Sequence, residues 1–151
     1  MYRKGVSALI FNKNKELLLV NLVSFEERFF AIPGGGLEDG EDLKEAVYRE
    51  IQEELGIEKE PLEYVGESDE PLRFKFKEIK FTRDGKDYEG SERYFFGFNF
   101  LGDDMDIKFN DGEVRSYKWV KLQDLKNYLL FESQLEETTK YIREIFPISN
   151  M

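Results

Sequence analysis

The chain has 151 residues, of which 40% are hydrophobic and 15% aromatic, so it is long and apolar enough to bury the core of one domain. Its 32 acidic and 22 basic residues give a net charge of −10, which disfavours sequence-independent binding to nucleic acid or to an anionic membrane. The chain contains neither cysteine nor histidine. This excludes disulfides, thiol nucleophiles, imidazole catalysis and the usual zinc ligands, so oxygen atoms must hold any metal.

No stretch of the sequence is apolar over the length of a membrane span, and the N-terminal segment lacks the long apolar run of a signal peptide. We therefore expect a cytoplasmic protein with no membrane partner. The acidic charge makes a nucleic-acid partner unlikely, whereas a small-molecule ligand is compatible with it.

The chain begins with a predicted β-hairpin. Val6, Ala8 and Ile10 alternate with other residues as on a strand with one buried face, and residues 17–20 form a second apolar strand. A loop follows, and then a brief strand is expected at Phe29–Ile32.

Glycines and a helix come next. Residues 34–36, all glycine, follow Pro33 and are expected to end the strand in a loop, because glycine adopts backbone angles closed to other residues. A helix is predicted from Asp42 to Leu55, with Gly56 as its C-terminal stop.

The remaining chain predicts more strands, then a polar loop at residues 103–113 and two closing helices. The apolar phase slips between Phe76 and Ile79, which indicates a bulge, and residues 83–86 are typical of a hairpin turn. The expected elements are strands at Leu62–Glu67, Leu72–Phe81, Tyr94–Phe100 and Ser116–Val120, and helices near Leu122–Leu130 and Ser133–Ile145. This mixture predicts an α+β or mixed α/β fold.

Carboxylates cluster on the predicted helix at residues 42–55. Glu50, Glu53 and Glu54 fall within one arc of the helix, at the edge of the core rather than on its far side. Arg49 is expected to pair with Glu45 one turn back and with Glu53 one turn on. The arc lies beside an apolar stripe made by Leu43, Val47, Ile51 and Leu55.

Two interpretations of this helix differ in chemistry. A glutamate-rich helix is most often a solvated surface or a face for another protein. A glycine-rich segment before a helix is instead typical of phosphate binding, although the Walker pattern of P-loop NTPases is absent. A divalent cation would reconcile carboxylates with phosphates, because Mg²⁺ or Mn²⁺ binds both.

The stretch from Gly35 to Ile57, GGLEDGEDLKEAVYREIQEELGI, resembles the Nudix box, G-x5-E-x7-R-E-U-x-E-E-x-G-U with U aliphatic. Every defined position of the box matches. The resemblance implies a Nudix-type α/β/α sandwich around a mixed β-sheet, formed by one domain over residues 1–151. It also implies a hydrolase that uses Mg²⁺ (or Mn²⁺) to cleave the pyrophosphate of a nucleoside diphosphate linked to another moiety.

The resemblance also implies roles for residues of the box. Glu50, Glu53 and Glu54 would be metal ligands, with Glu53 and Glu54 taking part in catalysis. Arg49 would be a further catalytic residue that holds them in place, and Glu41 would be an outer ligand or a helix anchor.

The resemblance specifies the roles of the glycines and of the general base less closely. Gly35 would give the loop its turn, and Gly34 and Gly36 would allow the backbone to approach metal or phosphate, so the three are substrate-binding candidates. The general base would be either a box glutamate or a carboxylate from a later loop. Glu113 is the candidate for the latter, and an ordinary loop position is its alternative.

Substrate recognition lies outside the box. Core packing or a solvated surface is the commoner role for every candidate there. The segment around residues 75–88 is expected either to cover the site or to form a dimer contact. The candidates are Phe25, Phe30 and Phe131 for base stacking, and Arg28, Arg73, Arg93 and Arg115 for phosphates.

Several alternatives stay open at this point. The chain could be a non-catalytic Nudix domain that binds or senses a nucleotide, and it could form a homodimer. An isopentenyl-diphosphate isomerase of the same fold is disfavoured, because those enzymes are expected to use cysteine and histidine. Damaged nucleotides, ADP-ribose or sugar nucleotides, dinucleoside polyphosphates and RNA 5′ ends are all possible substrates.

Overall fold

The computed structural model describes residues 1–81 and 87–147, and only the backbone of residues 76–81 and 87. Its strands are β1 (Tyr2–Phe11), β2 (Glu16–Leu22), β3 (Gly34–Gly36), β4 (Leu62–Glu67), β5 (Leu72–Phe81), β6 (Asp87–Phe100) and β7 (Val114–Lys121). Its α-helices are α1 (Leu43–Leu55) and α2 (Gln134–Ile145), and its 3-10 helices are η1 (Asp104–Asp106) and η2 (Leu122–Asn127).

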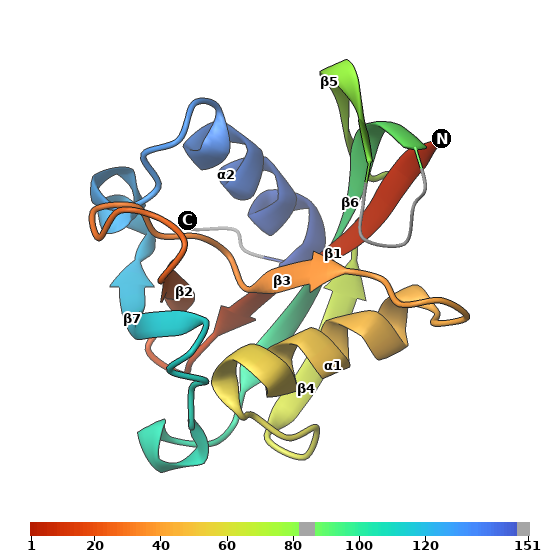
Figure 1. The fold of residues 1–151 in the computed structure, drawn as a ribbon. Helices are drawn as coiled ribbons and strands as arrows, with labels where there is room; N and C mark the ends of the chain where they lie inside the picture. Colours follow the sequence, from red (N-terminus) through yellow and green to blue (C-terminus); the bar gives the residue numbers. More distant parts are fainter. Residues whose placement is uncertain (82–86, 148–151) are drawn as a thin grey trace.

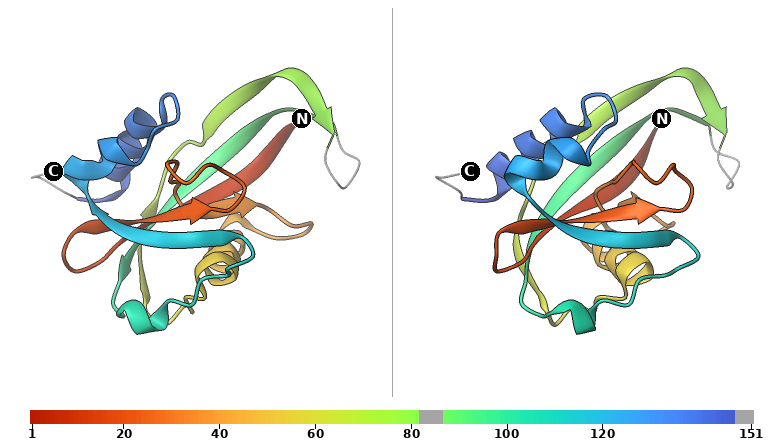
Figure 2. Two further views of the ribbon diagram at one scale, coloured as in Figure 1. Left: turned by 60° about the vertical axis from the view of Figure 1, so that its left-hand side comes forward. Right: turned by 90° about the vertical axis from the view of Figure 1, so that its left-hand side faces the viewer.

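The strands form one mixed sheet with helices on both faces (Figures 1 and 2). The order is β4-β6-β1-β2-β7, with β3 paired to β1 and β5 paired to β6. The central β1 and β6 are parallel, whereas the other pairs are antiparallel. The helix α1 covers one face and α2 the other, so the expected α/β/α sandwich is confirmed.

Alternation along β1 builds a separate core on each face of the sheet. Val6, Ala8 and Ile10 pack on the side of α1, whereas Leu9 and Phe11 pack on the side of α2. The helices complete these cores with Val47, Ile51 and Leu55 from α1 and with Tyr141, Ile142 and Ile145 from α2. The apolar stripe predicted for the first helix is therefore the surface that fixes α1 to the sheet.

The helix α1 begins and ends where the sequence predicts. The Asp42 side chain caps its first turn by accepting a hydrogen bond from the Glu45 backbone N–H at 2.8 Å. Gly56 ends it in the left-handed conformation, with φ of 66°. These two caps therefore fix where α1 begins and ends.

The glycines at residues 34–36 form β3, so the prediction of a loop there is wrong. Among the described glycines only Gly40 and Gly56 have positive φ, and a turn at Gly35 is therefore also wrong. The close approach of neighbours is what requires glycine in β3. A Cβ on Gly34 would lie 2.0 Å from the Val6 carbonyl oxygen, and one on Gly35 would lie 2.5 Å from the nearest carboxylate atoms of Glu50.

The strand predicted at Phe29–Ile32 is wrong for a different reason. Only an isolated bridge between Ala31 and Val20 occurs there. The buried Asn21 side chain donates to the carbonyl oxygens of Glu27 at 2.7 Å and of Phe29 at 3.1 Å. These bonds hold the segment as an ordered loop, because they occupy carbonyl groups that a strand partner would need.

The later elements follow the sequence more closely. The strands β4 and β5 have the expected bounds, and the register of β5 shifts between Lys75 and Lys80, which agrees with the expected bulge. The hairpin turn expected at residues 83–86 lies outside the described residues. The segment expected as a helix at residues 122–130 is the short 3-10 helix η2 instead, whereas α2 is confirmed. Within the described ranges, no helix is long and apolar enough to cross a membrane.

Replacing Gly34 tests the close approach of β3 to β1. We expect Gly34→Ala to lower the free energy of unfolding by about 2 kcal/mol or more, because the new methyl group would meet backbone that cannot rotate away. Gly112→Ala is the control, since its Cβ would lie 3.3 Å from the nearest atom, a side-chain oxygen. Equal urea midpoints for the two variants would contradict this account of β3.

Candidate catalytic and metal site

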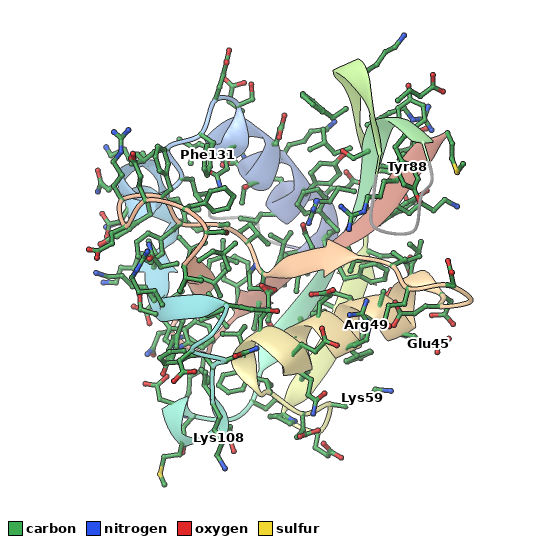
Figure 3. All side chains as sticks on the ribbon, in the orientation of Figure 1. Glu45, Arg49, Lys59, Tyr88, Lys108 and Phe131 are labelled. Carbon is green, nitrogen blue, oxygen red and sulfur yellow. The ribbon has the colours of Figure 1, made fainter. Side chains whose placement is uncertain are left out.

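The guanidinium of Arg49, on α1, is the centre of a carboxylate cluster. Its Nε lies 2.7 Å from Glu41 Oε2 and 2.9 Å from Glu38 Oε1. Its Nη1 donates to Glu50 at 3.0 Å and to Glu53 at 3.1 Å. Figure 3 labels Arg49 on the side of α1 that lies next to β3. One cation thus offsets the repulsion among several carboxylates.

Two details of this cluster differ from the sequence analysis. The described part of the chain shows no ion pair between Arg49 and Glu45, because Glu45 lies beside the cap Asp42 at the start of the helix. Glu38 is a partner that sequence reasoning missed, since it lies outside the defined positions of the box. The i+4 pair with Glu53 is confirmed.

Glu41 joins the middle of α1, through Arg49, to the segment that precedes the helix. The Arg49 side chain lowers the pKa of Glu41 by hydrogen bonding, which keeps this carboxylate charged. Glu41 also accepts a hydrogen bond from the Glu38 backbone N–H at 2.9 Å. Arg49 in turn donates to the Gly36 carbonyl oxygen at 2.9 Å, so the same side chain holds α1 against β3.

Glu54 is the most enclosed carboxylate of the cluster, with 4% of its surface exposed. Its Oε1 accepts a hydrogen bond from the Gly34 backbone N–H at 2.8 Å. Burial raises its pKa to about 8, and the charges of Glu50 and Glu113 add to that effect. Without a bound cation, this carboxyl group is therefore largely protonated at neutral pH.

Glu50 and Glu53 differ in their surroundings. Glu50 is half-buried beneath Gly35, and burial raises its pKa even though Arg49 acts in the opposite direction. The Glu53 side chain is 47% exposed. Glu50 and Glu54 thus lie at the edge of the core as expected, whereas Glu53, which accepts a hydrogen bond from Arg49, lies on the more exposed side of that edge.

Glu113 approaches the cluster from the loop before β7. Its charge raises the pKa of both Glu50 and Glu54, which places its carboxylate within electrostatic reach of the two. Its carbonyl oxygen accepts a hydrogen bond from the Val23 backbone N–H at 2.9 Å, which fixes the loop against the end of β2. A carboxylate far from the box in sequence therefore acts electrostatically on the same cluster.

The donor atoms of this site fit a hard divalent cation. They are carboxylate oxygens, the buried one has no salt bridge among the described residues, and the missing Cβ of Gly35 lets the Glu50 carboxylate pack against bare backbone. As arranged, no three acidic side chains of the described residues converge closely enough to surround an ion. Glu50 and Glu53 are turned toward Arg49, so ion binding requires them to turn away from it.

The aromatic candidates for substrate recognition lie in two places. Phe30 packs against Tyr128 beside the α2 core, as expected for a packing residue. Phe25 and Phe131 are 42% and 38% exposed, so core packing is wrong for these two. They form a surface cluster with Phe29, which stacks on Phe131 at 4.4 Å.

The four arginine candidates for phosphate binding also fall into two groups. Arg28 and Arg73 are exposed and pair with neighbouring glutamates, and Arg115 bonds to Asn21 and to the Phe25 carbonyl oxygen, where it supports the loop. Arg93 is not a solvated surface residue. Its guanidinium bonds to β1, and burial lowers its pKa.

The sequence matches the model of the NUDIX domain over residues 1–142. The chain belongs to the Nudix family. It is 30% identical over 132 residues to an RNA pyrophosphohydrolase of Pelagibacter ubique, covering 85% of this chain and 82% of that protein. It is 31% identical over 134 residues to an RNA pyrophosphohydrolase of Orientia tsutsugamushi, covering 85% of this chain and 81% of that protein. These matches identify a Nudix hydrolase, an enzyme that cleaves pyrophosphate bonds.

Solved structures agree with the fold of this Nudix chain. A MutT protein from Methanosarcina mazei superposes with a TM-score of 0.66 at 24% identity, covering 92% of this chain and 91% of that one. The E. coli dihydroneopterin triphosphate pyrophosphohydrolase gives a TM-score of 0.70 at 18% identity, with 95% and 98% coverage. At these identities the likeness establishes the fold.

The raised pKa of Glu54 predicts how stability depends on pH without metal. The pKa rises from 4.5 to about 8 on folding, so the folded state binds the proton more tightly than the unfolded state does. The stabilisation from this group is complete below about pH 4.5 and is lost as the pH rises through about 8. We expect the free energy of unfolding in EDTA to fall between about pH 4.5 and about pH 8, with a smaller fall in Glu54→Gln. Parallel curves for the two proteins in urea unfolding would contradict the assignment.

Proposed function

We propose that this Nudix hydrolase uses Mg²⁺ or Mn²⁺ to cleave the pyrophosphate of a nucleoside diphosphate linked to another moiety. The observation that carries the proposal is Glu54, a buried carboxyl group within electrostatic reach of Glu50 and Glu113. Burying an acid among other acids destabilises the empty protein, and a divalent cation offsets that cost.

Each residue of the cluster has a role in this proposal. Glu50, Glu53 and Glu54 would hold the cation, which when bound neutralises phosphate charge and polarises a phosphoryl oxygen. In the empty site Arg49 holds Glu50 and Glu53 and Glu41 anchors Arg49, and the two glutamates would turn from Arg49 to the cation. Gly35 brings bare backbone next to the Glu50 carboxylate and Gly36 brings it next to Arg3, so a phosphate would meet little steric hindrance from β3.

Two residues are candidates for the general base that takes a proton from the attacking water. Glu54 is buried next to Gly34 and would be ionised once a cation binds, so its carboxylate would be placed to accept a proton from a water held there. Glu113 is exposed beside the carboxylate cluster, where it can accept a proton and release it to solvent. The ratio of the activity losses in Glu54→Gln and Glu113→Gln distinguishes these roles.

The extent of the domain, the location in the cell and the size of the substrate are also proposals. A single Nudix domain over residues 1–151, a cytoplasmic location and a small-molecule nucleotide substrate are consistent with the family. The relatives named RNA pyrophosphohydrolase make an RNA 5′ end a competing substrate, although the net charge of −10 disfavours it. A homodimer remains a prediction.

A screen of phosphate release with Mg²⁺ tests the proposal. The substrates are nucleoside triphosphates, ADP-ribose, sugar nucleotides, dinucleoside polyphosphates and 5′-triphosphorylated RNA. We expect Glu54→Gln to lower kcat by about 10²-fold or more, because a metal-binding and proton-accepting charge is lost. Glu58→Gln makes the same chemical change on an exposed residue just beyond α1 and should keep wild-type activity.

The outcomes of this screen separate the alternatives. Turnover that depends on Glu54 and not on Glu58 supports the hydrolase. Turnover unchanged in Glu54→Gln would remove Glu54 from the reaction. Nucleotide binding without turnover of any substrate would favour a Nudix domain that senses nucleotides.

A further inference from the structure

Arg93 holds a positive charge against the centre of the sheet. It lies on β6 beside Gly5 of β1, and its Nη1 donates to the Val6 carbonyl oxygen at 3.1 Å and to Ser7 Oγ at 3.0 Å. A Cβ on Gly5 would lie 3.6 Å from Arg93 Nη2, so the guanidinium rests over bare backbone. Both acceptors are neutral, and the charge of Arg93 is therefore not neutralised by them.

A second guanidinium lies nearby. Arg3 lies two residues before Gly5 on β1, so the Arg3 side chain projects from the face of the strand on which Gly5 leaves bare backbone. The Arg3 side chain lies against Gly36, where a Cβ would be 2.7 Å from Arg3 Nη2. Burial and then the charge of Arg3 lower the pKa of Arg93, so the two cations are close enough to repel each other.

Neither cation has an ion pair in the described part of the chain. Glu54 and Glu50 attract Arg93 electrostatically, but neither carboxylate lies within the 4.0 Å of a salt bridge. The other arginine on this part of the sheet, Arg73, is paired with Glu92 at 3.4 Å. Two neighbouring guanidiniums that have no salt bridge among the described residues leave excess positive charge beside β3.

The strand β3 lies between this positive site and the carboxylates. Gly35 faces Glu50, whereas Gly36 faces Arg3. We propose that Arg3 and Arg93 bind a phosphate group next to the pyrophosphate that is cleaved, so that the substrate is a nucleoside with a chain of three or more phosphates. This inference rests on the proposed function, because it takes the carboxylate cluster as the place of cleavage.

The chemistry of the pair suits such a chain. Guanidinium groups match phosphate oxygens in geometry and charge, and the burial of Arg93 beside bare backbone means that solvent screens its attraction less. A substrate with two phosphates, such as ADP-ribose, has no further phosphate for the pair. Free nucleoside triphosphates and 5′-triphosphorylated RNA share the recognised group, and the experiment distinguishes them.

Arg3→Met is the direct test, because Arg3 is exposed and its loss leaves the core intact. We expect the ratio of kcat/KM for ATP to kcat/KM for ADP-ribose to fall about tenfold or more, mainly through KM for ATP. The control is Arg143→Met, which removes the same charge from a separate cavity lined also by Lys15 and Lys121. A ratio unchanged in Arg3→Met would overturn the inference. A higher kcat/KM for a triphosphorylated oligoribonucleotide than for ATP would support it and identify an RNA end as the source.

Calorimetry with inorganic tripolyphosphate and pyrophosphate separates this inference from the proposed function. We expect the wild type to bind tripolyphosphate more tightly than pyrophosphate, and Arg3→Met and Arg93→Met to lose that difference. Such binding without turnover of any nucleotide would support the phosphate site at Arg3 and Arg93 but refute the proposed function, and with it the assignment of a cleaved substrate. Nucleotide turnover with equal binding of the two polyphosphates would overturn the inference alone.

Discussion

The ion pairs of Arg49 hold together the part of the molecule on which the site depends. Its guanidinium contacts carboxylates from the segment before α1 and from α1 itself, and it also bonds to the backbone of β3. Without this cation, clustered glutamates would repel one another and separate the helix from the strand. The same contacts keep Glu50 and Glu53 in place, so one side chain serves both the fold and the arrangement of the acids.

The glycines of β3 make that arrangement possible from the other side. Bare backbone lets β3 lie close to β1 on one side and to the Glu50 carboxylate on the other. Because Arg3 and Arg93 lie beyond the strand, β3 separates a region of negative charge from one of positive charge. A divalent cation complements the negative region, and a polyphosphate complements the positive one.

The sequence predicted much of this and missed parts for definable reasons. The helix α1, its caps and its apolar stripe were predictable, because periodicity and capping are local. The strand β3 was not predictable. Glycine is needed there because of atoms of Val6 and Glu50, which are distant in sequence and come close only through tertiary packing. Glu113 was proposed from its place before a late strand, and the structure brings it to the cluster. The exposure of Glu53 and the ring cluster at Phe131 depend on tertiary packing that no local pattern contains.

Binding of Mn²⁺ followed by calorimetry in buffers of different ionisation enthalpy tests the central claim most directly. The account predicts that the wild type binds the ion near neutral pH and releases about one proton, because Glu54 must ionise to bind it. Glu54→Gln should bind more weakly and release almost no proton. Tight binding with the same proton release in both proteins, or no binding by the wild type at millimolar Mn²⁺, would contradict the account.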